Sequence, residues 1–387
     1  MVKAIKVMLI PNNIQKTKMF QYAGASRFAY NWALAREIEN YEKGGKFISD
    51  AELRKEFTKL RHSDEYAWLL GISNNVTKQA IKDACTAYKN FFKGLQKFPR
   101  FKSKKRSMPK FYQDNIKIQF SNTHVKFEGF SSSRKRNKQK LNWVRLAEHG
   151  CIPTDAKYMN PRISFDGLNW WISVCVEFPD CIEKLNDDGI GIDLGIKDLA
   201  ICSDGAKYKN LNKSQKVKKL EKQKRRLQRS ISRSYEKNKK GESYCKTNNV
   251  IKKEKLLLKR NHRLTNIRKN YLNQTTSEIV SRKPRFICIE DLNVSGMMKN
   301  RHLSKAVQNQ GFFEFRKQLE HKCRDKGIQL IVADRFYPSS KLCSCCGNIK
   351  KDLKLSDRIY KCDCGNVIDR DFQASINLKA YGERVAS

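Results

Sequence analysis

Acidic residues are scarce in this chain of 387 residues. It holds 39 aspartates and glutamates against 80 lysines and arginines, which gives a formal net charge of +41. An excess of this size is more than solubility needs and indicates a polyanionic partner. Long apolar runs are also lacking, since no stretch approaches the roughly 20 residues that a membrane-spanning helix requires. Nucleic acid is therefore favoured over a membrane as the partner.

Several familiar signatures are missing as well. The start, MVKAIKVMLIPNN, has an apolar part that is too short and too charged for a secretion signal, so we expect a cytoplasmic protein. Its 13 cysteines are then expected to be reduced and available to metals. A phosphate-binding loop is lacking, and the six histidines stand in basic or loop contexts without a nucleophile motif. We therefore do not expect catalysis by a Ser/His/Asp triad.

The N-terminal half changes its hydrophobic period twice. Residues 1–10 alternate loosely between apolar and polar side chains, which is typical of a strand. Between 14 and 109 the apolar residues recur at three- and four-residue steps, which indicates helices. The period returns to two between 111 and 178. We expect a small β-barrel or sandwich that the first strand joins, with the helices as an insertion.

Two basic segments and the first long helix are candidates for contacts with nucleic acid. PRFKSKKR (99–106) surrounds a phenylalanine with cations, which suits phosphate binding and base stacking. Residues 213–229 hold nine lysines and arginines against one acid. A solvated loop or helix face is the alternative in both cases, but the scarcity of acids favours nucleic acid. The candidate residues are Tyr22, Arg27, Tyr30, Asn31, Arg100, Phe101, Lys102, Lys104, Lys105, Lys218, Lys222, Arg225 and Arg226.

Two cysteine pairs near the C-terminus have the spacing of a zinc site. Cys343 and Cys346 form a C-x-x-C pair, Cys362 and Cys364 form a C-x-C pair, and a glycine follows each. Thiolates are zinc ligands, and the glycines let backbone amides turn toward the sulfurs. We expect one structural Zn²⁺ here, holding a segment too small for its own core. Cys345 is an alternative ligand, and plain buried thiols are the other interpretation.

Acids stand where three predicted elements begin or end. Asp193 lies in the apolar strand GIGIDLG, where a lone carboxylate costs desolvation energy unless it is paired or holds a metal. Glu290 ends the strand FICIE, and Asp369 or Asp371 opens a helical pattern. This is the layout of RNase H-like nucleases, in which acids hold two Mg²⁺ ions for phosphodiester hydrolysis. Alone, Asp193 would equally suit a turn or a buried ion pair.

Several motifs in this order resemble the TnpB proteins of bacterial and archaeal insertion sequences, which are similar to type V CRISPR effectors. The resemblance covers nearly the whole chain. It is carried by GASRFAYNWALA (24–35), PRFKSKK (99–105), GIDLGIKDLA (191–200), IEDLNVSGM (289–297), RFYPSSKLCSCCG (335–347) and CGNVIDRDFQASINL (364–378).

The resemblance implies an α/β multidomain protein. A wedge-like β-barrel domain would be split between 1–13 and 110–184, with a helical recognition domain at 14–109. A RuvC-like (RNase H-like) nuclease domain at 185–387 would carry a zinc ribbon at 340–367 as an insertion that binds target nucleic acid.

The resemblance also implies a function. It implies Mg²⁺-dependent, RNA-guided cleavage of double-stranded DNA next to a short transposon-adjacent motif. The guide RNA would derive from the transposon end, in a monomeric ribonucleoprotein of the prokaryotic cytoplasm that joins the nucleoid when it binds DNA. Asp193, Glu290 and Asp371 match the family's catalytic acids, which hold two Mg²⁺. The four cysteines of the two pairs match its ligands for one zinc.

The chain departs from the family pattern at two places. Gln373 stands where the family usually has asparagine, with Ser375 in place of the second alanine, and the second cysteine pair is C-x-C. A longer amide would place its hydrogen bond differently. A catalytically impaired RNA-guided DNA-binding repressor is therefore an alternative, and a transposase without a guide RNA is another. The presence of all three acids favours the nuclease over the repressor. A transposase would share these acids, and the family resemblance makes it the least expected of the three.

Overall fold

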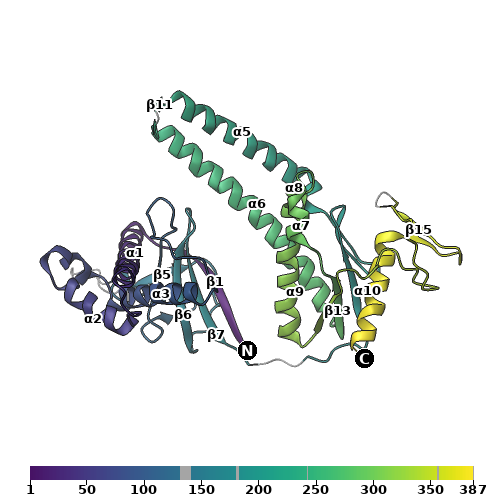
Figure 1. Cartoon of the computed structure of the whole chain (residues 1–387), viewed down its shortest axis with the longest axis horizontal. Coiled ribbons are helices and arrows are strands. Elements are labelled where there is room, and N and C mark those ends of the chain that lie inside the picture. The colour runs from purple at the N-terminus through teal and green to yellow at the C-terminus, as the bar shows by residue number, and fades with distance from the viewer. Residues whose placement is uncertain (131–140, 180–182, 242, 355–356, 387) are drawn as a thin grey trace. The chain divides into compact units, whose positions relative to one another are not determined.

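The chain forms two compact units, Met1–Pro179 and Asp180–Ser387. The computed structural model, drawn in Figure 1, describes residues 1–130, 141–179, 183–241, 243–354 and 357–386. None of its described helices combines the length and apolar character that crossing a membrane requires.

The first unit is built on a seven-stranded sheet with the order β2-β6-β7-β1-β5-β4-β3. β1 (Val2–Ile10) pairs antiparallel with β7 (Trp170–Glu177) and with β5 (Trp143–Leu146), so the first strand joins the late strands as the sequence predicts. The described pairings leave β2 and β3 as edges and do not close the predicted barrel. The other strands are β2 (Lys110–Tyr112), β3 (Gln119–Phe120), β4 (His124–Lys126) and β6 (Tyr158–Phe165).

Helices follow directly on β1. α1 (Asn13–Glu42) begins with a capping box, in which Asn12 and Gln15 bond to each other's backbone N–H groups. α1 packs against α3 (Asn74–Phe92), and fully buried alanines one turn apart let the two helices approach closely. The unit also holds α2 (Asp50–Arg61) and the 3₁₀ helix η1 (Asp64–Gly71).

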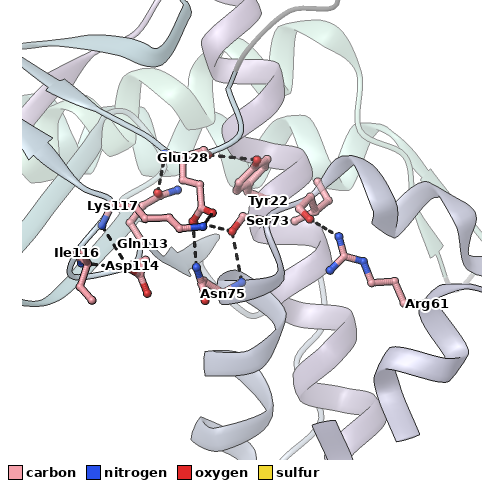
Figure 2. Close-up of polar contacts among 10 residues, drawn as sticks. Tyr22, Arg61, Ser73, Asn75, Gln113, Asp114, Ile116, Lys117 and Glu128 are labelled. Carbon is pink, nitrogen blue, oxygen red and sulfur yellow. Dashed lines mark hydrogen bonds and ion pairs between the residues drawn. The ribbon is translucent and has the colours of Figure 1, made fainter. Parts of the chain in front are cut away.

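A polar junction centred on Glu128 fastens these helices to the sheet (Figure 2). Its carboxylate accepts hydrogen bonds from Ser73 Oγ at 2.9 Å, Asn75 Nδ2 at 3.1 Å and Lys117 Nζ at 2.6 Å. Tyr22 of α1 donates its hydroxyl to the Glu128 carbonyl at 3.3 Å. Burial opposes ionisation of Glu128, but Lys117, Asn75 and Ser73 together hold its pKa below the usual range. The junction thus satisfies a partly buried charge with several partners.

The second unit contains a five-stranded mixed sheet with the order β10-β9-β8-β13-β14. β8 (Ile190–Leu194), β9 (Asp198–Cys202) and β10 (Lys207–Lys209) form antiparallel pairs. β13 (Phe286–Glu290) runs parallel to both β8 and β14 (Gln329–Ala333). The carboxyl ends of β8, β13 and β14 therefore lie at one edge of the sheet.

Helices cover both faces of this sheet. Ile287 and Ile289 of β13 pack in one cluster with residues of α6 (Asn248–Ser281) and α9 (Phe312–Lys326). Phe286 and Cys288 pack on the other face with Leu378 of α10 (Arg370–Ala386). A strand that is buried on both faces needs apolar residues at every position, which explains the uninterrupted FICI run.

α10 lies unusually close to β8. A Cβ added to Gly191 would stand 2.0 Å from the Ser375 carbonyl oxygen and 2.3 Å from the Lys379 nitrogen. A Cβ at Gly382 of α10 would stand 2.2 Å from the Phe286 ring. These two glycines therefore set the distance between α10 and the sheet.

α5 (Gln215–Lys237) and α6 form a long helical hairpin, with β11 at its tip (Figure 1). Val217 and Leu220 of α5 pack on Leu264 of α6, which leaves the cationic side chains outside. The remaining elements of the unit are η3 (Leu211–Lys213), β11 (Lys239–Lys240), β12 (Ser243–Tyr244), α7 (Val294–Lys299), α8 (Ser304–Gln310), β15 (Ile359–Lys361) and β16 (Val367–Asp369).

Candidate active site and metal centre

The three predicted acids line one open cavity of about 680 Å³. Asp193 lies near the end of β8 and Glu290 ends β13. Because Ile192 pairs with Ile289 in these parallel strands, the two acids follow side by side at the same sheet edge. Side chains alternate between the two faces of a strand, and both acids lie on the face that α10 covers. Asp371 reaches the same cavity from the first turn of α10. The fold thus brings together three acids that are far apart in the sequence.

Burial and mutual repulsion oppose ionisation of the two strand acids. Burial, followed by the charges of Glu290 and Asp371, raises the pKa of Asp193 well above its ordinary value. Burial also raises the pKa of Glu290 to about 7, although the Leu194 N–H donates to its carboxylate at 3.2 Å. Crowded carboxylates of this kind fit a hard divalent cation, which would neutralise them and prefers oxygen ligands.

The structure gives Asp369 and Asp371 different surroundings. Asp369 Oδ1 accepts hydrogen bonds from the N–H groups of Asp371 and Phe372, both at 3.0 Å, and so caps α10. Asp371 instead lines the cavity, where its carboxylate pairs with Arg370 at 3.1 Å and with Arg358 at 3.4 Å. Sequence reasoning missed both arginines. Arg370 stands inside the DRD motif and could have been found, whereas only the fold brings Arg358 to the cavity.

The four predicted zinc ligands form one cluster, in which all four sulfurs lie within 4.8 Å of one another. Cys343 Sγ is 3.6 Å from Cys364 Sγ, and Cys346 Sγ is 3.6 Å from Cys362 Sγ. A tetrahedron of Zn–S bonds about 2.3 Å long has edges of about 3.8 Å, so the spacing fits one zinc. Both cysteines of the C-x-C pair belong to the cluster. Among the described residues, the cluster does not include Cys345.

The surroundings of Cys343 favour its thiolate form. Burial opposes the charged form of Cys343, but the backbone N–H groups of Cys346 and Cys345, together with Asn366, lower its pKa to about 6. Metals bind the thiolate rather than the thiol. The hydrogen bonds that favour the thiolate of Cys343 therefore also suit this residue to bind a metal.

Gln373, which stands where the family usually has asparagine, hydrogen-bonds to the cysteine loops and not to the three acids. Its side chain is fully buried, and its amide bonds to Leu342, Ser344 and Asn366 beside the cysteines. Ser375 donates its hydroxyl to the Phe372 carbonyl at 2.6 Å within α10. The longer amide thus reaches the cysteine loops from the helix that carries Asp371.

The predicted cations of α5 share one groove. Lys218, Lys222, Arg225 and Arg226 are all exposed and line a groove of about 610 Å³. The acid in this groove, Glu221, is paired with Arg268 of α6 at 2.9 Å. The groove therefore presents positive charge, which suits a phosphate backbone.

Two of the candidates in the first unit lie in its core. Tyr22 is 1% exposed and Tyr30 is 6% exposed, so neither has surface with which to contact nucleic acid, contrary to our expectation. Asn31 has a structural role, because its side chain bonds to the backbone N–H and C=O of Lys102, both at 2.8 Å. Burial lowers the pKa of Lys102 to about 7. Core-facing and ligand-facing residues of a helix share one period, so sequence could not separate them.

The remaining candidates of the first unit lie at its surface. Arg100, Lys104 and Lys105 are exposed, and Phe101 is 57% exposed, as stacking on a base would require. Arg27 lines a small pocket together with Lys102. This part of the basic segment is accessible to a ligand.

Family models match three segments of the chain. Residues 173–301 match the model described as "Probable transposase", and residues 312–378 match "Cas12f1-like, TNB domain". Residues 1–46 match a model described as "Helix-turn-helix domain". In the structure this last segment contains β1 and the single long helix α1.

Relatives match almost the whole chain. "Putative RNA-guided DNA endonuclease InsQ" of Escherichia coli (strain K12) is 30% identical over 403 residues, which cover 99% of this chain and 93% of InsQ. The chain belongs to the TnpB family. A further relative, "Putative RNA-guided DNA endonuclease" of Streptomyces pristinaespiralis, is 29% identical, with 98% of this chain and 89% of the relative covered.

Solved structures support the fold of this TnpB protein. It is similar to the protein in the "Cryo-EM structure of the Cas12f1-sgRNA-target DNA complex", with a TM-score of 0.60 and 12% identity. The match covers 98% of each chain. At this identity the likeness establishes a shared fold.

Proposed function

We propose that this TnpB protein is an RNA-guided endonuclease that cuts double-stranded DNA beside a short transposon-adjacent motif. The observation that carries the proposal is the meeting of Asp193, Glu290 and Asp371 around one cavity. The names of the two full-length relatives support an RNA guide and a DNA substrate.

In this proposal the three acids hold two Mg²⁺ ions in a RuvC-like domain. Such ions supply Lewis-acid catalysis of in-line phosphodiester hydrolysis. Asp193 and Glu290 sit on adjacent strands of a sheet that is buried on both faces, so their carboxylates are held rigidly. Lys197 and Lys213 line the same cavity, and Lys213 Nζ donates to the Lys197 carbonyl at 3.0 Å. These cations would draw the DNA phosphates toward the acids.

The four clustered cysteines hold one structural Zn²⁺ in this proposal. The ion would stabilise the loops around the β15–β16 hairpin, a segment with few buried residues of its own. The domain limits expected from the sequence belong to the same proposal: a wedge-like domain, a helical recognition domain at 14–109 and a zinc ribbon at 340–367 within the nuclease domain.

The guide RNA, derived from the transposon end, would lie on the basic groove of α5. Base pairing with the guide would read the DNA sequence, while the protein reads the flanking motif and the shape of the duplex. In this proposal the ribonucleoprotein contains one copy of the chain, which carries both the groove and the acids.

The alternative function, a repressor, depends on the amide at Gln373 displacing the catalytic acids. Its hydrogen bonds to Leu342, Ser344 and Asn366 leave the three acids in place around the cavity. This geometry favours the nuclease over the repressor.

A cleavage assay tests the proposal. The protein is coexpressed with its transposon's 3′ end, and the ribonucleoprotein is given guide-matched DNA with a randomised flank, in Mg²⁺ or in EDTA. We expect cutting in Mg²⁺ alone, beside a defined motif. Asp193→Ala should abolish cutting and retain binding of RNA and target. Cutting by Asp193→Ala would refute the assignment, and binding without cutting by the wild type would support the repressor.

A further inference from the structure

Gln373 joins the catalytic helix to both cysteine loops. Its Oε1 accepts hydrogen bonds from Ser344 Oγ at 3.1 Å and from Asn366 Nδ2 at 2.9 Å. Its Nε2 donates to the Leu342 carbonyl at 2.8 Å. Leu342 and Ser344 flank Cys343, and Asn366 follows the second cysteine pair. One buried amide therefore touches both halves of the zinc site.

Asn366 extends this contact to a sulfur. The Nδ2 atom that donates to Gln373 also lies 3.5 Å from Cys343 Sγ, where it donates to the thiolate. Groups that hydrogen-bond to metal ligands orient them, and removing such a group typically lowers metal affinity about 10- to 100-fold. Gln373 thus orients the side chain that supports the first zinc ligand.

A second amide fixes the same loop to α10. Asn377, one turn after Gln373, donates to the Leu342 carbonyl at 2.7 Å and to the Ser339 carbonyl at 2.7 Å. The carbonyl next to Cys343 therefore accepts from two amides of the helix whose first turn holds Asp371. A shift of the cysteine loops relative to α10 would break these bonds together.

The chain itself adds a second connection. β16 of the ribbon ends at Asp369, and α10 begins at Arg370 without an intervening loop. The position of Asp371 is thus set by elements that the zinc site holds. Continuity alone fixes one end of the helix, whereas Gln373 fixes how the helix faces the cysteine loops.

We propose that Gln373 is a positioning residue that couples zinc binding at the four cysteines to the placement of the Asp371 carboxylate. Zinc loading then strengthens divalent-cation binding by the three acids. The inference rests on the proposed function, because it takes the cysteines and the acids as the two sets of metal ligands. Linkage requires the coupling to be reciprocal, so cation binding at the acids also strengthens zinc binding.

The test measures both affinities on the full chain without nucleic acid. Mn²⁺ replaces Mg²⁺, because free Mn²⁺ can be quantified by electron paramagnetic resonance. The Mn²⁺ binding that remains in the Asp193→Ala variant is subtracted from the binding of each other protein. Zinc affinity is measured by competition with a chromogenic chelator. In the wild type, zinc loading should raise Mn²⁺ affinity about 5- to 150-fold, the usual range of coupling between two sites.

Gln373→Met keeps the length of the side chain and removes its hydrogen bonds. We expect its Mn²⁺ affinity to be nearly independent of zinc and its zinc affinity to fall about 10- to 100-fold. Gln373→Asn, which keeps an amide on a shorter arm, should give an intermediate coupling and serves if the methionine variant does not fold. Ser375→Ala is the matched control, since this buried hydroxyl bonds within α10, and it should behave as the wild type.

The outcomes separate the two proposals. Wild-type coupling in both Gln373 variants, or an equal loss of coupling in Ser375→Ala, would overturn the role of Gln373 while both metal sites stand. Wild-type protein without zinc or Mn²⁺ binding would overturn the proposed function, and this inference with it.

Discussion

Replacing Gly191 by alanine tests whether the close packing of α10 on β8 is needed to bring the three acids together. Gly191 lies two residues before Asp193 and faces the backbone of α10. The added methyl group would stand 2.0 Å from the Ser375 carbonyl oxygen and 2.3 Å from the Lys379 nitrogen. Both obstacles are backbone atoms within a helix, so no side-chain rotation can relieve the clash.

The size of the effect follows from these distances. Ordinary contacts begin at about 3.5 Å, so α10 must retreat by more than about 1 Å. Overpacking of this kind destabilises a fold by about 1–3 kcal/mol. The retreat also carries Asp371 away from Asp193 and Glu290, and a misplacement of about 1 Å lowers reaction rates about 100-fold. We therefore expect folded protein that cuts at least about 100-fold more slowly.

The assay compares single-turnover cleavage with thermal unfolding of the second unit. Gly24→Ala is the matched control, because Gly24 lies within α1 and an added Cβ there meets nothing within 4 Å. Gly24→Ala should stabilise α1 by about 1 kcal/mol and leave the cleavage rate unchanged. A Gly191→Ala variant that cuts at the wild-type rate would refute the packing argument.

Three further predictions concern the other groups of the site. In EDTA, stability should fall by about 3 kcal/mol from pH 4.5 to pH 7, because burial raises the pKa of Glu290 to about 7 and the folded state holds its proton through that window. Urea denaturation should show Glu290→Gln flattening this slope, and an unchanged slope would contradict it. Cys362→Ser should release zinc and lower the unfolding temperature, and retained stoichiometric zinc in elemental analysis would refute that ligand. Lys222→Ala should reduce the salt dependence of guide-RNA affinity by about one in log–log slope, and an unaltered slope would exclude a phosphate contact.

Much of this site was readable in the sequence because its signals are local. Each signal lies within a few residues. They are an acid in an apolar strand, an acid at a strand end, and paired cysteines followed by glycines. The side-chain period of two places Asp193 on the same face of its strand as Gly191, and Glu290 on the same face as Cys288. The register of the two parallel strands and the packing of α10 then put both acids on one side of the sheet. The three acids meet around one cavity, and the four sulfurs form one cluster.

Other features were decided by the tertiary structure. The helical period of Tyr22 and Tyr30 fits a core face as well as a ligand-binding face, and the structure packs both in the core. Asp369 and Asp371 read alike in the sequence, but the start of α10 makes one a cap and leaves the other in the cavity. In the sequence, Gln373 departs from the family pattern two residues after the acid Asp371. In the structure, its amide hydrogen-bonds to the cysteine loops.

The division has a physical reason. The amino-acid sequence by itself determined the charge, the metal-ligand types and the faces of individual strands, because these depend on residue chemistry and on the short period of one element. Burial and hydrogen-bond partners depend on which elements pack together. Only the tertiary structure therefore decided that Arg358 reaches Asp371 and that one amide on α10 reaches both cysteine loops.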